Sequence, residues 1–429
     1  PYLRRRAGEE KVEYPHPSLE PILARTLGVP LFQEQGMQVA IACAGFSAGE
    51  ADMLRRAMGH KRSRERMAAI CAKLIEGMKA NGIAEDTAVR IYNQINAFAD
   101  YGFPESHAAS FALLVYASAY LKHYYAPEFT AAILNAQPMG FYAPGTLIED
   151  ARRHGVKVHP VDVRRSQWDA TLEPTSDAGD AAPAVRLGVR SVRGLGSKAK
   201  EILEGALKNG RFDSIEDFAR RTRFDQRTLR HLAEAGAFDG FVPDEPDLRK
   251  RRAALWEVLD ALRGDAGPLA PRRRASPGAA SRAAGLPRMS PGELTEADYR
   301  MTGVSLNGHP MAHLRPLLVP NGVRTARQLV TEGKDGDHIA SAGLVICRQR
   351  PGTAKGFVFL TLEDETGTVN VVVTPKRFER QALLISTTPL LLVRGTLQVE
   401  QGVVNIRGKE FRGLKAEVGA EYAQRHDFH

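Results

Sequence analysis

The stretch FVFLTLEDETGTVNVVVTP, residues 357–375, combines aromatic and β-branched residues with a period of two around an acidic, glycine-containing run. Such a period is typical of β-strands, and the run Glu-Asp-Glu-Thr-Gly is typical of the turn in a hairpin. Runs of the same kind surround this hairpin, at 338–350, 389–400 and 403–411. One helical run, 376–385, separates the third strand from the fourth. The sequence therefore predicts five β-strands with a helix after the third.

That order of elements is the order of an OB-fold barrel. Such barrels bind single-stranded nucleic acid with a basic groove and stacking aromatic side chains. The residues that could do so here are Arg348, Arg350, Lys355, Phe357 and Phe359. Phe357 and Phe359 are two apart and so lie on one face of a strand. On this alternation alone, an ordinary place in the barrel core fits the two phenylalanines slightly better.

Upstream of the barrel, SVRGLGSKAKEILE (191–204) places Gly194-Leu195-Gly196 directly before a helix. This sequence motif predicts a helix-hairpin-helix turn, in which glycines let the backbone approach a phosphate and the start of the helix offers free N–H groups. Lys198 and Lys200 would add cations to a contact that reads the DNA backbone and not its sequence. The alternative is a chance glycine turn. A second, degenerate copy at 229–241 keeps only Gly236.

The N-terminal part of the chain is helical, and FSAGEADMLRRAMGHKR (46–62) is its most basic helix. Ser47 and Glu50 match the capping-box motif, so we expect the helix to begin at Ser47. Adjacent arginines diverge by about 100° around a helix. We therefore expect Arg56 to pair with Asp52 on the surface and Arg55 to stay free. The alternatives are a solvated basic helix and a surface that holds an anion.

A second helical segment, 106–138, is apolar on nearly every side and is predicted to be buried within a helical domain. The turn before it contains Tyr101, and Ser106 is a candidate N-cap. His107 then falls in the first helical turn, beside N–H groups that favour anions. A lone histidine there is more often a satisfied cap or core residue.

Amino-acid composition gives weaker indications of binding partner and cellular compartment. The 429 residues carry a net charge of +9, which favours an anionic partner such as nucleic acid but also fits an ordinary basic protein. Three cysteines without a C-x-x-C pair fit a reducing cytosol. No apolar run reaches the roughly 18 residues that a membrane span requires. The chain opens on Pro1 without a signal-peptide core, which suggests a piece of a longer protein.

A search for an active centre finds two groups of neighbouring carboxylates, Asp335 with Asp337 and the run Glu363 to Glu365. Two-metal phosphoryl transfer requires such neighbours on a strand. Both groups fall in turns, where acidic residues are common for conformational reasons. We therefore expect neither group to bind metal.

Several long stretches resemble one family, the bacterial C-family DNA polymerases, or polymerase III alpha subunits. Residues 31–61 and 98–135 resemble its fingers, VRGLG falls where it has a tandem helix-hairpin-helix, and GVSLNGHPM (303–311) resembles the element before its OB domain. Residues 135–166 and 348–373, and an end at RHDFH, are similar to the error-prone, damage-inducible subclass. The resemblance covers nearly the whole chain.

The resemblance implies a multidomain α+β chain with four parts. These are fingers at 1–165, a small β element with the tandem helix-hairpin-helix at 166–262, a flexible linker at 263–296, and the OB domain with a short lead-in at 297–429.

It also implies part of a DNA-directed DNA polymerase, a nucleotidyltransferase used in translesion synthesis during the DNA damage response. Arg55, Arg56 and Lys61 would contact the incoming triphosphate, and Tyr101 and His107 would line the same pocket. Primer-template DNA, dNTP, accessory translesion proteins and the sliding clamp would be partners, in the bacterial cytoplasm. Mg²⁺ would be held by a palm domain outside this chain, so the chain alone should bind DNA without extending it. A stand-alone, non-catalytic DNA-binding or scaffold protein remains the alternative.

Overall fold

A computed structural model of the chain describes residues 1–58, 64–97, 104–138, 143–175, 182–243, 246–263, 285–352, 354–414 and 426–428. The chain forms two compact units, Pro1–Leu121 and Lys122–His429.

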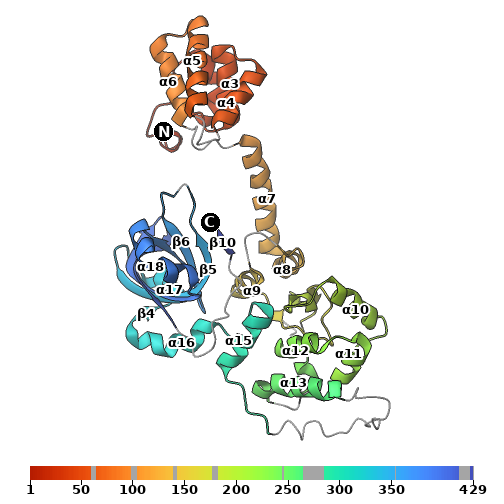
Figure 1. Ribbon diagram of the computed structural model, residues 1–429. Coiled ribbons are helices and arrows are strands. Elements are labelled where there is room, and N and C mark those ends of the chain that lie inside the picture. The colour runs from red at the N-terminus through yellow and green to blue at the C-terminus, as the bar shows by residue number, and fades with distance from the viewer. Residues whose placement is uncertain are drawn as a thin grey trace. The chain divides into compact units, whose positions relative to one another are not determined.

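The first unit is helical (Figure 1). Its helices are α1 (Tyr2–Arg6), η1 (Pro17–Leu19), α2 (Glu20–Leu23), η2 (Ala24–Thr26), α3 (Gln33–Ala44), α4 (Ala48–Met58), α5 (Arg64–Ala80), α6 (Glu85–Ala97) and most of α7 (Glu105–Tyr124). The apolar faces of α3 to α6 form the core, where Val39, Leu54, Leu74 and Ile91 are at most 1% exposed. Burial of these side chains fixes the rotation of α4, and with it the direction of the α4 arginines.

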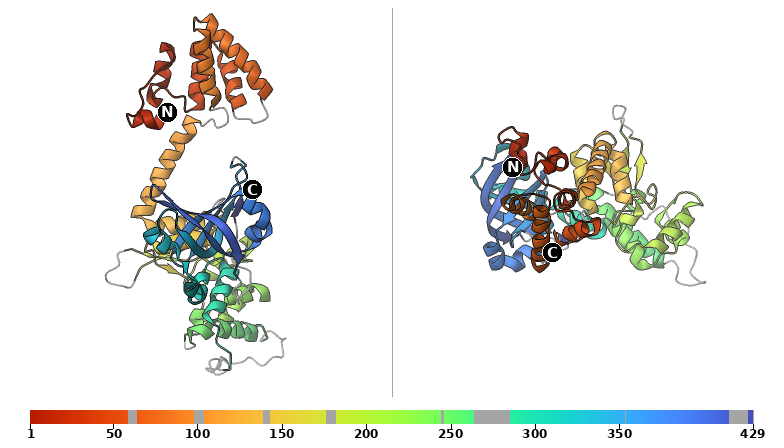
Figure 2. Two further views of the ribbon diagram at one scale, coloured as in Figure 1. Left: turned by 90° about the vertical axis from the view of Figure 1, so that its left-hand side faces the viewer. Right: turned by 90° about the horizontal axis from the view of Figure 1, so that it is seen from above.

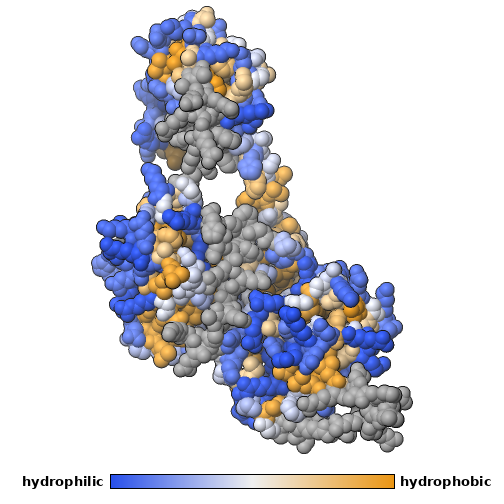
Figure 3. All heavy atoms as spheres, in the orientation of Figure 1, coloured by the Kyte–Doolittle hydropathy of each residue, from blue (hydrophilic) through white to orange (hydrophobic). Residues whose placement is uncertain are grey.

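Helix α7 differs from the sequence-based expectation. No residue of α7 is buried, and Leu113 and Tyr116 are 71% and 74% exposed. Hydrophobic spheres lie along this helix in Figure 3. The prediction of a buried helical segment at 106–138 was therefore wrong for α7, whereas the helix that follows it, Ala126–Asn135, buries Pro127, Thr130, Ala131 and Leu134. Helix α7 also begins at Glu105, so Ser106 is not its N-cap.

The second unit begins with helices and a small sheet. Its first elements are α8 (Ala126–Asn135), α9 (Pro144–Arg153), β1 (Val158–His159), β2 (Thr171–Glu173), β3 (Ala184–Arg186), η3 (Val189–Ser191), α10 (Ser197–Leu207), α11 (Ile215–Thr222), α12 (Gln226–Glu234), η4 (Asp239–Phe241) and α13 (Asp247–Arg263). The strand order is β1-β3-β2, with β1 parallel and β2 antiparallel to β3. Phe218, Leu229, Leu232 and Phe238 lie in one core that joins these elements.

The second unit then continues into the barrel, which confirms the α+β fold class. The elements are α15 (Pro291–Thr302), α16 (Pro310–Leu318), η5 (Val319–Asn321), β4 (Val323–Arg324), α17 (Ala326–Glu332), β5 (His338–Gln349), β6 (Val358–Asp364), β7 (Gly367–Val373), α18 (Pro375–Thr387), β8 (Leu390–Glu400), β9 (Val403–Gly413) and β10 (His426–Phe428). Helix α15 begins inside the predicted linker. The other predicted domain boundaries remain predictions.

Five strands close the barrel in the order β5-β6-β7-β9-β8, because β8 pairs back with β5 (Figures 1 and 2). Neighbouring strands are antiparallel except β7 and β9, which are parallel. Leu360, Val371, Val393 and Ile406 fill the interior and are at most 1% exposed. The predicted strands and the helix after the third are confirmed.

Candidate nucleic-acid interfaces

The turn between η3 and α10 carries the predicted hairpin glycines. Gly194 has φ +90°, a conformation that side chains rarely adopt, so glycine is required there. Gly196 is the N-cap of α10 in an extended conformation, with φ −112°, and a Cβ built on it meets nothing within 4 Å. The two glycines therefore differ: Gly194 shapes the turn, and Gly196 leaves its surface open.

The start of α10 is exposed. The amide of Ala199 donates to the carbonyl of Gly196 at 2.9 Å, which leaves the amides of Ser197 and Lys198 at the outer end of the helix. The Lys198 side chain is exposed beside them, whereas the Lys200 ammonium lies 3.8 Å from the Glu204 carboxylate. Backbone amides, the helix dipole and one lysine thus converge on a place suited to a phosphate.

The second glycine turn, at Gly236, is packed inside the unit. Gly236 has φ +77°, and a Cβ there would lie 2.5 Å from the Arg251 guanidinium and 2.9 Å from the Asp239 carboxylate. Arg251 itself is buried and pairs with Asp298 at 2.6 Å. This turn is therefore a structural element and presents no backbone to a phosphate.

The outer face of the barrel carries a row of side chains across three strands. Phe359 on β6 is opposite Val372 on β7, and Val372 is opposite Arg407 on β9. Phe359 is 37% exposed, so the core interpretation is wrong for this residue. The row brings an aromatic ring, an apolar side chain and a cation onto one face.

A parallel row lies next to it. Thr361, Asn370 and Asn405 are aligned by the same registers, and the Thr361 hydroxyl lies 3.1 Å from the Asn370 amide oxygen. Sequence reasoning did not identify Asn370, Asn405 or Arg407. Their positions depend on the parallel pairing of β7 with β9, which no local pattern shows.

The loop before β6 holds most of the other predicted barrel residues. Lys355 is exposed with φ +49°, and Phe357 is half-buried. The Arg350 guanidinium lies over the Phe378 ring, 4.8 Å from its centroid. Arg350 therefore has a cation–π partner on α18 and remains at the surface.

Arg348 does not belong with these residues. Its side chain is 6% exposed and donates from Nε to the Ile385 carbonyl at 2.7 Å and from Nη2 to the Thr388 carbonyl at 2.5 Å. It satisfies carbonyls at the C-terminal end of α18, so a structural role replaces the predicted DNA contact.

Helix α4 confirms its capping box, since the Ser47 amide donates to the Glu50 carboxylate at 2.8 Å and the Glu50 amide donates to the Ser47 hydroxyl at 3.4 Å. Hydrogen bonds from Lys73 and Ser47 lower the pKa of Glu50 to about 2. Both arginines approach Asp52, Arg55 at 2.8 Å and Arg56 at 2.8 Å. The expectation that Arg55 stays free was wrong.

The remaining nucleotide-site predictions fall near α7. Lys61 and Tyr101 lie outside the described residues. His107 is exposed in the first turn of α7, with its ring 4.5 Å from the Phe111 ring. The structure therefore brings Arg55 and Arg56 together on α4 and leaves their relation to the other three residues a prediction.

Three family models match separate parts of the chain. The bacterial DNA polymerase III alpha subunit finger domain matches residues 1–82, the helix-hairpin-helix motif matches residues 155–248, and the OB-fold nucleic acid binding domain matches residues 342–414. An error-prone DNA polymerase of Anaeromyxobacter dehalogenans strain 2CP-C is 48% identical over 436 residues, which is 100% of this chain. Over its whole length, the chain is similar to one part of these error-prone DNA polymerases. These matches confirm the resemblance and support DNA as a partner.

Other error-prone polymerases give the same result. One from Alkalilimnicola ehrlichii is 45% identical over 100% of this chain, and error-prone DNA polymerase 2 of Rhizobium meliloti is 44% identical over 98%. The chain spans 37–40% of the length of these relatives. An asparaginyl-tRNA synthetase structure from Pyrococcus horikoshii matches 22% of this chain and 23% of its own chain at 21% identity. The TM-score of this match is 0.19. No described helix is long and apolar enough to cross a membrane.

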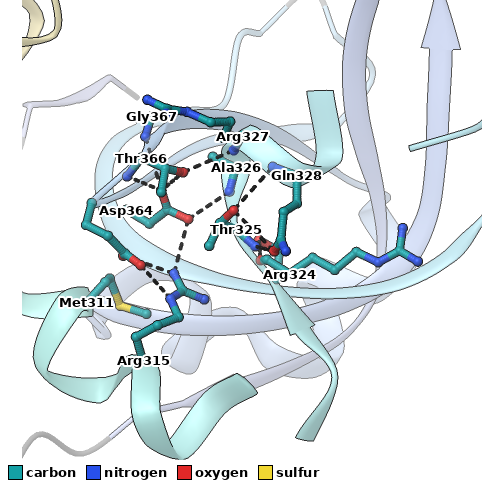
Figure 4. A network of polar contacts seen from close by, with 12 residues as sticks. Met311, Arg315, Arg324, Thr325, Ala326, Arg327, Gln328, Asp364, Thr366 and Gly367 are labelled. Atoms are coloured by element: carbon teal, nitrogen blue, oxygen red, sulfur yellow. Dashed lines mark hydrogen bonds and ion pairs between the residues drawn. The ribbon is translucent and has the colours of Figure 1, made fainter. Parts of the chain in front are cut away.

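The DNA polymerases that the chain resembles imply a divalent metal cofactor, and within the described residues no group of carboxylates, histidines or cysteines is placed to hold one. The sequence placed the run Glu363 to Glu365 in a turn, but Glu363 and Asp364 are the last residues of β6 and are 2% exposed. Asp364 and Glu365 accept hydrogen bonds from Arg315 on α16, and Asp364 also accepts from the Ala326 amide at 2.7 Å (Figure 4). These oxygens join the β6–β7 hairpin to α16 and α17.

The other acidic groups are similarly occupied. Glu363 accepts from Arg153 on α9 at 2.9 Å, and burial, which outweighs this contact, raises the pKa of Glu363 to about 7. Burial also lowers the pKa of the neighbouring His309 to about 4. Asp335 accepts the Val399 amide, and Asp337 accepts the Lys334 amide. Glu363 and its neighbours therefore form a structural junction between α9, α16, α17 and the barrel.

Proposed function

We propose that this chain holds DNA and contacts the nucleotide within an error-prone DNA polymerase that acts in translesion synthesis during the DNA damage response. The observation that carries the proposal is the pair of exposed modules in the second unit. The α10 turn offers backbone amides and Lys198 to a phosphate, and the barrel offers Phe359 and Arg407 to an unpaired strand. A polymerase requires both, because its substrate has a duplex part and a single-stranded template.

The two modules bind DNA through different interactions. The hairpin turn contacts the phosphate backbone of the duplex without reading its sequence, so its affinity falls steeply with salt. The barrel stacks bases on Phe359 and neutralises the strand with Arg350, Lys355 and Arg407, which tolerates any sequence because every base has a stacking face. Gly194 and Gly196 act in the first module, and Phe357 and Lys200 lie beside the two surfaces.

We propose that Arg55 and Arg56 bind the triphosphate of a dNTP, with Lys61, Tyr101 and His107 in the same pocket. Both arginines now share Asp52, and Arg56 is 74% exposed. A surface ion pair contributes little because solvent screens it, whereas a charge-assisted hydrogen bond to phosphate is among the stronger polar contacts. Exchange of Asp52 for a triphosphate is therefore favourable, and Asp52 holds the arginines in place until nucleotide arrives.

The metal-dependent step is proposed to use residues outside this chain. Mg²⁺ is the cation we expect there, since it binds carboxylates together with substrate phosphates. Accessory translesion proteins and the sliding clamp are proposed as further partners, and the bacterial cytoplasm as the location.

Primer extension tests the proposal. The purified chain should bind a primer-template without extending it. Adding the remaining part of the polymerase should restore template-directed extension, and Arg55→Ala should impair it. Extension by the chain alone would place the metal site among its own carboxylates. Binding that no added polymerase segment converts into extension would favour the stand-alone DNA-binding or scaffold protein.

A further inference from the structure

The hairpin turn before α10 is held from two sides by elements that follow it in the sequence. The ring of His231, on α12, places Nδ1 3.0 Å from the carbonyl oxygen of Arg193. The Arg193 amide donates to the Met301 carbonyl of α15 at 2.7 Å. One peptide segment at the start of the turn is thus fixed through both its N–H and its C=O groups.

The next residue is in contact with the same ring. A Cβ built on Gly194 would lie 2.9 Å from Nδ1 and 3.3 Å from Cε1 of His231. The imidazole therefore covers Gly194 on the side where any other residue would carry its side chain. The turn can adopt φ +90° at Gly194 and still pack tightly, because the histidine ring fills the space.

The rotation of α12 aims His231 at this turn. Leu229, Leu232 and Ala233 are fully buried in the core of the unit, so the helix cannot rotate without exposing them. The Asp225 carboxylate accepts the Thr228 amide at 2.8 Å and fixes where the helix begins. His231 is thereby presented by a rigid element.

The Arg193 carbonyl also determines which ring nitrogen of His231 carries a hydrogen. A carbonyl oxygen only accepts, so the Nδ1 that faces it carries the hydrogen. An imidazolium also carries a hydrogen on Nδ1, so the contact survives protonation of the ring.

We propose that His231 is a positioning residue for DNA binding: it fixes the Arg193 carbonyl and Gly194 so that the amides of Ser197 and Lys198 are arranged for a phosphate before DNA arrives. This inference rests on the proposed function of the turn. His231 itself does not contact the phosphate. Its loss should therefore change the affinity for duplex DNA without changing the number of ionic contacts.

Duplex affinity as a function of salt separates these two effects. We expect His231→Leu, which fills space but donates no hydrogen bond, to weaken duplex binding by about three- to ten-fold at every salt concentration, the fold-change of one net hydrogen bond. The slope of log K against log salt should stay that of the wild type. Lys198→Ala should instead lower the slope by about one.

Two further variants complete the design. His231→Asn keeps an amide N–H near the position of Nδ1 and should restore most of the affinity. His154→Leu is the matched control, because His154 Nδ1 also lies 2.7 Å from a carbonyl, that of Asp150, away from the turn. It should leave duplex binding unchanged. Circular dichroism and binding of single-stranded DNA by the barrel show that each variant is folded.

Several outcomes would overturn the inference. His231→Leu with wild-type duplex affinity, while Lys198→Ala binds more weakly, would remove the positioning role and leave the proposed function intact. A slope reduced by about one in His231→Leu would mean that the histidine contacts phosphate directly. Equal weakening in His231→Asn and His231→Leu would exclude the hydrogen bond as the cause. Unchanged duplex binding in both His231→Leu and Lys198→Ala would refute the role of the turn itself.

Discussion

The two glycines of the hairpin turn should respond oppositely to alanine. Gly194 has φ +90° and Gly196 has φ −112° with open space around its Cβ position. Alanine in the left-handed region costs roughly 1–2 kcal/mol. At Gly194 it also displaces His231, whose hydrogen bond contributes about 0.5–1.5 kcal/mol. Gly194→Ala should therefore destabilise the turn locally by about 1.5–3.5 kcal/mol.

Gly196→Ala should have the reverse effect on stability. A glycine replaced by alanine in a compatible conformation is stabilising by about 0.4–1 kcal/mol, because the unfolded chain loses freedom. The same Cβ projects where we expect the backbone to meet a phosphate. The variant that is more stable than the wild type should thus bind duplex DNA more weakly.

Hydrogen exchange of peptides spanning 189–207 measures local stability in the whole chain. Fluorescence anisotropy with duplex and single-stranded DNA, at two salt concentrations, measures binding. We expect faster exchange for Gly194→Ala only, and weaker duplex binding with unchanged single-strand binding for Gly196→Ala. Wild-type duplex affinity in Gly196→Ala, with exchange no faster than in the wild type, would refute the phosphate contact at this turn.

Three other substitutions test the roles of Arg55, Arg348 and Glu363. In a polymerase that contains the palm, Arg55→Ala should raise the nucleotide KM or lower kcat with DNA affinity retained, since a phosphate contact contributes about 1.5–3 kcal/mol; loss of thermal stability with unchanged kinetics would indicate a surface helix only. Arg348→Ala should lower the free energy of unfolding of the barrel by at least roughly 1.5 kcal/mol, because two buried carbonyls lose a charged donor; a variant that only binds DNA more weakly would contradict the structural role. The pKa of Glu363, raised from 4.5 to about 7, means that the folded state holds a proton that the unfolded state releases, so this group makes stability fall as pH rises from about 4.5 to 7. At roughly 1.4 kcal/mol per pKa unit, the free energy of unfolding should fall by about 3 kcal/mol over this pH range, and Glu363→Gln should remove this fall. If the difference in free energy of unfolding between Glu363→Gln and the wild type did not change with pH, Arg153 would be keeping this carboxyl ionised.

The barrel could be predicted from the sequence because each strand is a local pattern with a period of two. The same reasoning located the Gly-Leu-Gly turn and the capping box at Ser47, which depend on neighbouring residues. Arg348 was misassigned because its partners, the carbonyls of Ile385 and Thr388, lie about forty residues away. The acidic run at 363–365 was assigned to a turn for the same reason, because its partners Arg153 and Arg315 lie far away in the sequence.

Other features depend on pairing between distant elements. The row formed by Phe359, Val372 and Arg407 requires the parallel register of β7 with β9. The contact of His231 with Arg193 requires α12 to pack beside a turn 38 residues earlier. Helix α7 shows the converse limit, since its apolar composition predicts a buried helix but none of its residues is buried.

We expect duplex and single-stranded DNA to bind to separate surfaces of this chain. The most direct measurement is a cross-comparison of Lys198→Ala and Phe359→Ala against both DNAs by anisotropy. Lys198→Ala should weaken duplex binding and lower its salt slope by about one, with single-strand affinity unchanged. Phe359→Ala should lose about 1–3 kcal/mol of single-strand binding, with duplex affinity unchanged. Equal loss for both DNAs in each variant would contradict the separation of the two surfaces.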